Sequence, residues 1–302
     1  MVSRGFFAHS RFAIHHSPIA MTHLTRLRLS AFRNYHSAAL DLDGRHLVLT
    51  GPNGAGKTNL LEAVSLLSPG RGLRRAAFDA VGNQASDQPW AVAATLETPA
   101  GPVDIGTGAA ADGGRRVRIN GANARSIEQM SDYLRLLWLT PAMDGLFTGP
   151  AGDRRRFLDR LVTTLVPTHS ATVSSFDTAM RQRNRLLEER ADPLWLAALE
   201  AEMAAHAAAL HFARADAVAH LRALIAANRD NDGFPAAELA LTPLFDDAAE
   251  PATSADLEAA FKTLWASSRD LDRAAGRTLA GPHRVDLEVF YAQKQMPAAL
   301  GS

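Results

Sequence analysis

Gly51-Pro52-Asn53-Gly54-Ala55-Gly56-Lys57-Thr58 is the stretch that decides the fold, because it has the spacing G-x-x-x-x-G-K-[ST] of a phosphate-binding loop. Its glycines permit a tight turn in which successive backbone N–H groups point inward at a polyphosphate. Lys57 supplies a cation for the β- and γ-phosphates, and the Thr58 hydroxyl is a ligand for Mg²⁺. The stretch therefore predicts that all eight residues bind a nucleoside triphosphate, with Mg²⁺ on Thr58.

The residues on both sides of this loop support the prediction. Residues 46–50 form a short, mostly apolar run that is typical of a buried parallel strand. Residues 58–67 combine good helix formers with apolar residues at helical spacing, and Ser68-Pro69-Gly70 ends them. Such a helix directs the positive end of its dipole at the phosphates. Lysine occurs only at positions 57, 262 and 294 in a chain with 32 Lys and Arg, which argues against a chance match.

Composition places the chain among ordinary globular proteins. It has 302 residues, of which 47% are hydrophobic and 21% charged. There are no cysteines, so disulfides, cysteine-ligated zinc and thiol catalysis are excluded. No apolar run approaches the ~18 residues that cross a bilayer. The formal net charge is +0, so DNA binding would have to come from local patches or depend on another ligand.

The chain before the loop has two different parts. Residues 1–20 contain basic residues and no acid, and a regular pattern begins only at Met21. We expect translation to start at Met21, or residues 1–20 to be a disordered extension. Residues 24–30 and 37–42 alternate in polarity, which predicts two strands on either side of Phe32-Arg33-Asn34-Tyr35.

With these motifs in view, the chain resembles the RecF family of bacterial DNA replication and repair proteins. The resemblance rests on Phe32-Arg33-Asn34-Tyr35, on Asn59-Leu60-Leu61-Glu62-Ala63 after the phosphate-binding loop, on Arg154-Arg155-Arg156-Phe157-Leu158-Asp159, and on Gly281-Pro282-His283-Arg284. It implies an α/β P-loop NTPase with an ABC-type, SMC-like head and an inserted helical arm with a short coiled coil. The expected divisions are 21–150 for the head, 151–275 for the arm and 276–302 for a return to the head.

The resemblance also implies a function. Members of the family bind ATP with Mg²⁺, dimerise around it, associate with single-stranded or gapped DNA and work with other recombination mediator proteins in the cytoplasm. ATP would act as a switch that supports DNA repair, replication and the SOS response. The resemblance places Arg33 near the nucleotide, where a surface arginine on a turn is an equal alternative. It also places Asp144 in a loop that senses the γ-phosphate or Mg²⁺, where a helix-capping role explains the residue as well.

Several arginines are candidates for DNA contact. Arg154, Arg155 and Arg156 form the most basic local run and are expected to bind DNA phosphates, with salt bridges inside the helical region as the alternative. Arg116 and Arg118, with Arg115, lie on a predicted strand. They suit either phosphate contact or a solvated strand face. For His283 and Arg284 the sequence leaves open a place at the nucleotide or at an interface between heads.

The remaining pattern predicts further elements. Residues 90–97, 103–106, 116–119 and 285–291 are expected as strands, and 134–139 as a second parallel strand. Asp153 is expected to cap a helix that extends to Leu165, followed by helices over 170–190, 193–228 and 254–275. Within the third helix, apolar residues at seven-residue intervals predict a coiled-coil seam. They are Leu196, Met203, Leu210, Ala217 and Leu224.

One group that the family needs is not found in this sequence. No run of four apolar residues is followed by the Asp-Glu pair that completes ATP hydrolysis, and the family's signature would begin where Gly301 and Ser302 stand. We therefore expect an incomplete RecF-type chain that binds nucleotide without hydrolysing it. The alternatives are the nucleotide-binding subunit of another ABC-type ATPase, or a non-catalytic nucleotide-binding fragment.

Overall fold

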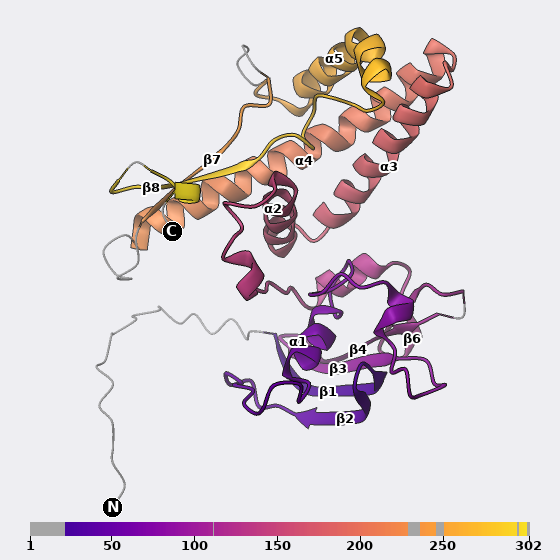
Figure 1. Ribbon diagram of the computed structural model, residues 1–302, viewed down its shortest axis with the longest axis vertical. Coiled ribbons are helices and arrows are strands. Elements are labelled where there is room, and N and C mark those ends of the chain that lie inside the picture. Colours follow the sequence, from indigo (N-terminus) through magenta and orange to yellow (C-terminus); the bar gives the residue numbers. More distant parts are fainter. Residues whose placement is uncertain (1–21, 111, 229–235, 246–250, 295, 301–302) are drawn as a thin grey trace, which may run out of the picture. The chain divides into compact units, whose positions relative to one another are not determined.

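The computed structural model describes residues 22–110, 112–228, 236–245, 251–294 and 296–300 (Figure 1). The extension predicted over residues 1–20 lies outside this range. The chain divides into two compact units. The first unit contains residues up to Leu60 together with Phe78–Ala124, and the second contains Leu61–Ala77 with the residues from Arg125 onward. This division rests on compactness alone. The predicted boundaries at residues 150 and 275 also concern function, so they stay predictions.

The first unit is built on a six-stranded sheet. Its order is β2-β1-β3-β4-β5-β6, and every neighbouring pair is antiparallel. Alternation of polar and apolar residues places Leu29, Val92, Leu96 and Ile105 on one buried face, as the period of a strand requires. The strands predicted over this region are confirmed. They are β1 (His23–Phe32), β2 (Tyr35–Asp41), β3 (Ala91–Thr98), β4 (Gly101–Ala109), β5 (Arg115–Ile119) and β6 (Ala122–Asn123).

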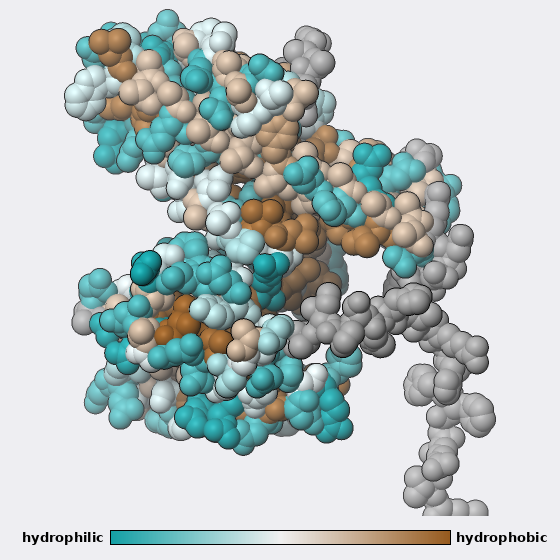
Figure 2. All heavy atoms as spheres, turned by 180° about the vertical axis from the view of Figure 1, so that it is seen from behind, coloured by the Kyte–Doolittle hydropathy of each residue, from teal (hydrophilic) through white to brown (hydrophobic). Residues whose placement is uncertain are grey.

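The two predicted parallel strands are not present. Residues 46–50 and 134–139 have no strand conformation, and no described strand pairs with either of them. Val48 and Leu139 are 79% and 75% exposed. A strand is stabilised by hydrogen bonds to a neighbouring strand, so an apolar run without such a neighbour does not become one. Figure 2 shows apolar surface, coloured brown, among predominantly polar side chains on the face that it presents.

The helix after the phosphate-binding loop is confirmed as α1 (Lys57–Ser65). Residues 70–75, which follow this helix, pack on its second half. The Leu73 N–H donates to the Ser65 hydroxyl at 2.7 Å, and Arg74 forms an ion pair with the buried Glu62 at 2.9 Å. A Cβ added at Gly72, where φ is +66°, would lie 2.8 Å from the Ser65 hydroxyl. Glycine is therefore needed at this turn.

The second unit is mainly helical, and the predicted helices are confirmed within a few residues. They are α2 (Ala151–Leu165), α3 (His169–Glu188), α4 (Pro193–Asn228) and α5 (Ser254–Ala275). Pro150 is the N-cap of α2, and Asp153 lies in its first turn, so the capping role predicted for Asp153 is wrong. Proline has no backbone N–H. It is tolerated at the start of a helix because the first N–H groups there have no acceptor within the helix. Four of the five predicted seam residues of α4 are buried, whereas Leu224 is 59% exposed.

The core of the second unit lies where α3, α4 and α5 pack together. Phe261 and Trp265 stack with ring centroids 4.9 Å apart, and Phe176 and Met203 are buried beside them. Burying each such side chain is worth roughly 1.5–3 kcal/mol, so this cluster stabilises the helical packing. A second sheet in the order β7-β8-β9 completes the unit. Its strands are β7 (Ala237–Leu241), β8 (Leu287–Tyr291) and β9 (Met296–Pro297). Four 3₁₀ turns complete the described elements: η1 (Phe78–Val81), η2 (Ile127–Asp132), η3 (Pro141–Met143) and η4 (Ala298–Leu300).

Candidate nucleotide-binding site

The phosphate-binding loop, residues 51–58, has the backbone that its glycines predict. Gly51, Gly54 and Gly56 have φ of +139°, +83° and +100°. A residue with a Cβ is strained in this region, whereas glycine adopts it freely. No heavy atom lies within 4 Å of a Cβ added at Gly51 or Gly54. The backbone of the loop is therefore open to a ligand at these two positions.

Gly56 is held more closely than the other two glycines. A Cβ added there would lie 2.5 Å from the Tyr35 hydroxyl and 2.9 Å from Asn34 Nδ2. Asn59 Nδ2, in the first turn of α1, donates to Asn34 Oδ1 at 2.7 Å. The Phe-Arg-Asn-Tyr turn after β1 thus packs directly against the loop and fixes its last glycine. The sequence motif indicated that this turn matters, but not that Asn34 and Tyr35 make the contact.

Lys57 and Thr58 lie at the end of the loop and the start of α1. The Lys57 ammonium donates to the carbonyl oxygens of Gly51 and Pro52, each at 2.7 Å, so it lies over the turn of the loop. Thr58 is exposed in the first turn of α1, where the helix dipole favours negative charge. The loop therefore combines a cation, a hydroxyl and helix N–H groups, which is the donor set that a polyphosphate with Mg²⁺ requires.

Arg33 and Asp144 were the other predicted nucleotide contacts. Arg33 has a positive φ of 53°, and its guanidinium donates to the carbonyl oxygen of Ala80 at 2.7 Å. Arg33 belongs to the turn that packs on the phosphate-binding loop. This position is consistent with the predicted place near the nucleotide. Asp144 is exposed and forms the C-cap of η3 in the second unit. Both roles stay predictions.

The three arginines predicted to bind DNA differ in their surroundings. Arg154 donates to Asp286 Oδ2 at 2.6 Å and to the carbonyl oxygen of Gly149 at 2.8 Å, so its guanidinium serves contacts inside the unit. The ion pair with Asp286 raises the pKa of Arg154. Arg156 is half-exposed and pairs with Asp153, whereas burial lowers the pKa of Arg155. The predicted DNA contact stays a prediction, and Arg154 would have to leave its ion pair to make it.

The family motifs of the second unit are joined by a second ionic contact. Asp159 accepts two hydrogen bonds from the Arg214 guanidinium, both at 2.8 Å, and one from the His169 ring at 2.9 Å. Burial opposes ionisation of Asp159, but these partners outweigh it and lower its pKa. Arg214 also donates to the carbonyl oxygen of Pro282 at 2.7 Å. These motif residues therefore hold α2, α4 and the segment before β8 together.

His283 is buried in the second unit. Its Nε2 lies 3.1 Å from the carbonyl oxygen of Thr278, and its ring lies 5.9 Å from the Phe176 ring. Burial lowers its pKa to about 4, with smaller contributions from Arg284 and Arg155. A neutral histidine in this core is a structural residue of the unit.

Arg183 is a fully buried charge of the second unit. It donates to Glu200 at 2.9 Å, to Asp272 at 2.7 Å and to the carbonyl oxygen of Trp265 at 2.9 Å. Its side chain has no exposed surface. Because every one of these partners lies in the helical core, Arg183 connects α3 with α4 and α5 rather than offering a contact to a ligand.

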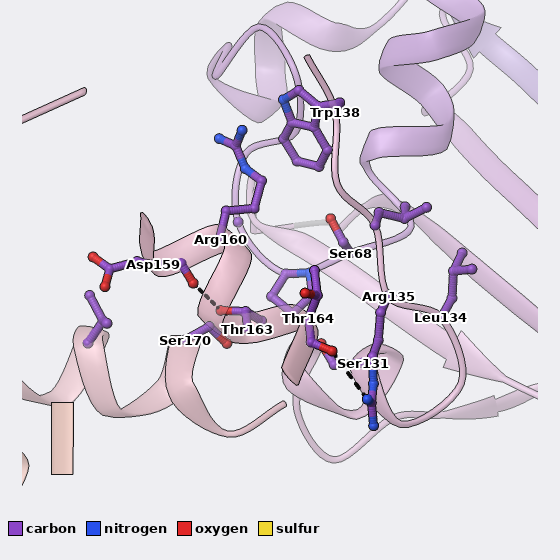
Figure 3. A pocket seen from close by; sticks show the side chains of 14 residues that line it. Ser68, Ser131, Leu134, Arg135, Trp138, Asp159, Arg160, Thr163, Thr164 and Ser170 are labelled. Atoms are coloured by element: carbon purple, nitrogen blue, oxygen red, sulfur yellow. Dashed lines mark hydrogen bonds between the residues drawn. The ribbon is translucent and has the colours of Figure 1, made fainter. Parts of the chain in front are cut away.

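A cavity of about 200 Å³ lies in the second unit beside α2 and α3 (Figure 3). Arg160 stacks on the Trp138 ring at 4.0 Å, and burial lowers the pKa of Arg160. Arg135 and Thr163 also line the cavity, but each donates to a backbone carbonyl oxygen, that of Thr164 and of Asp159 respectively. The cavity is therefore a largely apolar space beside one stacked cation.

The described residues contain neither a metal cluster nor a membrane-spanning helix. No group of three or more His, Cys, Asp and Glu side chains there could hold a metal ion, so the histidines of α4 do not form such a site. Within the same residues, no helix combines the length and the apolar character that crossing a membrane requires.

Comparison with known proteins identifies the loop's family. A model of the AAA domain matches residues 26–84, which include the phosphate-binding loop. The DNA replication and repair protein RecF of Rhizobium meliloti (strain 1021) is 53% identical over 280 residues, which cover 91% of this chain and 74% of that protein. The RecF protein of Mesorhizobium japonicum is 50% identical over 287 residues, covering 94% of this chain and 76% of its own length.

Solved structures agree at the level of the fold. The structure of the recombination mediator protein RecF-ATP in the RecFOR pathway superposes with a TM-score of 0.82 at 20% identity, and covers 95% of this chain and 78% of that one. The predicted α/β P-loop NTPase fold is confirmed. Together with a phosphate-binding loop built against a Phe-Arg-Asn-Tyr turn, identity above one half over nine-tenths of the sequence leads to one conclusion: the chain belongs to the RecF family of DNA replication and repair proteins.

Proposed function

We propose that this chain binds ATP and Mg²⁺ through residues 51–58 and uses the nucleotide as a switch in DNA repair. The observation that carries the proposal is the loop itself, in which three glycines at positive φ precede Lys57 and Thr58 at the start of α1. Lys57 would neutralise the β- and γ-phosphates, and Thr58 would hold Mg²⁺. The bound metal would neutralise phosphate charge and fix its orientation.

The wider role is proposed from family membership. ATP-dependent dimerisation, binding of single-stranded or gapped DNA, support of the SOS response in the cytoplasm and contact with other recombination mediators belong to this proposal. A subunit of a different ABC-type ATPase no longer fits a chain of this family. Nucleotide binding is the activity that we propose for these residues.

The test is a titration with a fluorescent ATP analogue. Lys57→Ala removes charged hydrogen bonds worth roughly 1.5–3 kcal/mol, so affinity should fall about 10- to 100-fold. Lys262→Ala removes the same charge from an exposed position on α5 and should leave affinity unchanged. Thr58→Ala should weaken binding when Mg²⁺ is present and have little effect in EDTA. Equal affinities for the Lys57 and Lys262 variants would overturn the proposal.

The switch is tested by titrating labelled single-stranded DNA with and without ATP. DNA affinity should rise with ATP in the wild type and not in Lys57→Ala. If ATP changes the DNA affinity of neither protein, the switch is refuted. The titration with the ATP analogue would still decide nucleotide binding separately.

A further inference from the structure

The exposed face of the six-stranded sheet has a regular arrangement that nucleotide binding does not use. We call this the outer face. In one row across the sheet, Arg28 on β1 pairs with Ala93, Ala93 with Gly106, and Gly106 with Arg118 on β5. The next row runs in the same way from Ser30 to Arg116. Residues paired across a sheet point to the same side. The arginines of β1 and β5 therefore flank the two central strands.

Between these arginines the outer face has almost no side chains. Ala91 and Ala93 on β3 and Gly106 and Gly108 on β4 form the floor of a groove. Exposed strand positions usually hold larger side chains, which pack on their neighbours. A hollow of about 390 Å³ lies over this part of the sheet, and Arg28, Ala93, Gly106 and Arg118 are among the residues that line it.

Packing explains only one of the two glycines. A Cβ at Gly108 would lie 2.7 Å from the carbonyl oxygen of Trp90, so glycine is required there. At Gly106 the nearest heavy atom, the carbonyl oxygen of Val92, would be 3.9 Å away, and φ is not in the left-handed region. The sheet could therefore hold a larger residue at position 106, and the open floor needs a reason other than the fold.

The charges on the groove are predominantly positive, with Asp104 as the acid among the residues that line the hollow. Among the residues that the structure describes, neither Arg28 nor Arg116 has a carboxylate partner, and Arg118 makes a single bond, of 3.3 Å, to the Asn123 amide oxygen. Glu97 is exposed at the far end of β3. Two further acidic residues lie in the adjoining row, and one of them, Asp104, also lines the hollow. There Asp41 pairs with Arg26 at 2.5 Å, and Asp104 accepts a hydrogen bond from the Thr95 hydroxyl.

Arg115 does not belong to this set, although it adjoins Arg116 in sequence. Its guanidinium donates to the Thr107 hydroxyl at 2.7 Å and lies over the Phe78 ring at 5.8 Å. Successive residues of a strand point to opposite faces, so Arg115 lies on the other side of the sheet. Of the three arginines that sequence pointed to, only Arg116 and Arg118 remain on the outer face.

The dimensions of the groove indicate an extended ligand. β1 and β5 are three strand spacings apart, so roughly 14 Å separates the two rows of arginines. Along β5, Arg116 and Arg118 are about 6.8 Å apart, twice the ~3.4 Å interval between charges on one nucleic-acid strand. A compact anion would reach only one side of such a groove. A polyphosphate chain would meet arginines on both.

We propose that the outer face binds the phosphodiester backbone of DNA, with Arg28 on one side of the groove and Arg116 and Arg118 on the other. The choice of DNA as the polyanion rests on the proposed function. Guanidinium groups bind phosphate oxygens bidentately, and a floor of Ala and Gly lets a backbone approach the sheet. An acidic polypeptide, which arginine clusters also recognise, fits less well, because a floor of Ala and Gly offers no pocket for its side chains.

The experiment uses the full chain and a fluorescent single-stranded oligonucleotide, titrated at several salt concentrations. The test variant is Arg28→Ala/Arg116→Ala/Arg118→Ala. The control, Arg45→Ala/Arg222→Ala/Arg277→Ala, removes the same formal charge from exposed positions outside the outer face. Each phosphate contact to a single strand contributes about −0.7 to the slope of log affinity against log salt, so the test variant should have a slope shallower by about 2. A fourfold rise in salt should then weaken wild-type binding roughly 20-fold more than binding by the variant.

A second variant separates the groove from its charge. Gly106→Val fills the floor, leaves every charge in place and suits a strand, so thermal stability should be kept or raised while DNA affinity falls. Unchanged affinity in both the arginine and the Gly106 variants would overturn the proposal. Tighter binding of poly-aspartate than of DNA, lost in the same variants, would reassign the groove to an acidic protein. ATP-analogue binding should persist in all these variants, so failure of the Lys57 prediction can be distinguished from failure of this one.

Discussion

Replacement of Gly56 tests whether the Phe-Arg-Asn-Tyr turn shapes the phosphate-binding loop. Gly56→Ala introduces a Cβ at a φ of +100°, 2.5 Å from the Tyr35 hydroxyl and 2.9 Å from Asn34. Gly54→Ala is the matched control, because its φ of +83° is also unfavourable but no heavy atom lies within 4 Å of the new Cβ. The first change adds a steric clash to backbone strain, whereas the second adds strain alone.

The magnitudes follow from these two effects. Backbone strain of this kind costs about 1–3 kcal/mol, so Gly54→Ala should lower the free energy of unfolding by that amount. Overpacking typically adds another 1–3 kcal/mol, so Gly56→Ala should lower it by roughly 2–6 kcal/mol in total. In a Tyr35→Ala background the clash with the ring is removed. The effect of Gly56→Ala should then move toward that of Gly54→Ala, with the contact to Asn34 Nδ2 remaining and a coupling energy of about 1–3 kcal/mol.

The assay combines urea denaturation with titration of a fluorescent ATP analogue for the four proteins of the double-mutant cycle and for Gly54→Ala. Nucleotide affinity should fall more in Gly56→Ala than in Gly54→Ala and recover in part with Tyr35→Ala. The reasoning is refuted if the two glycine variants have equal free energies of unfolding, or if Tyr35→Ala leaves the effect of Gly56→Ala unchanged.

Three further predictions concern the second unit. Arg183→Met should lower the free energy of unfolding by about 3–5 kcal/mol in urea denaturation, because Asp272 is left as a buried charge; Asp272→Asn in the same background should restore part of it. His283 has a folded pKa of about 4, below its unfolded value of 6.5, so the unfolded chain binds the proton first and stability should fall as pH drops from 6.5 to 4, by about 3 kcal/mol at most. His283→Gln should flatten this pH dependence in thermal melts, and an unchanged profile would contradict the assignment. Thr253→Ala removes the N-cap of α5, where the threonine hydroxyl accepts from the Asp256 N–H, and should cost about 1 kcal/mol, whereas Thr253→Ser should be nearly neutral.

Local elements were predicted well wherever the signal lies within the element. The helix expected over 254–275 is observed as Ser254–Ala275, because Thr253 caps its start and Gly276, at a φ of +66°, ends it. The antiparallel strands of the first sheet alternate in polarity, and this pattern is visible without knowledge of their partners. Cap, period and turn are all contained in a few neighbouring residues.

Predictions that depended on a distant partner did less well. Residues 46–50 and 134–139 have the composition of buried strands, but composition does not supply the neighbouring strand with which to pair. Leu224 continues the seven-residue interval of α4 and yet is exposed, because a seam is buried only as far as its partner helices extend. The ion pair of Arg154 could not be predicted either, because its partner Asp286 is 132 residues away in the sequence and yet lies within 2.6 Å.

By itself the sequence determined the phosphate-binding loop, its lysine and threonine, the helix that follows, and membership of a family whose motifs recur along the chain. These depend on spacing over a few residues, which the backbone converts directly into geometry. Only the tertiary structure decided that Tyr35 closes on Gly56, that Arg154 is held in an ion pair, and that Arg28, Arg116 and Arg118 share one face of the sheet. The physical reason is strand register. A shift of one residue would move each of these arginines to the opposite face, and register is set by pairing between segments that lie far apart in the chain.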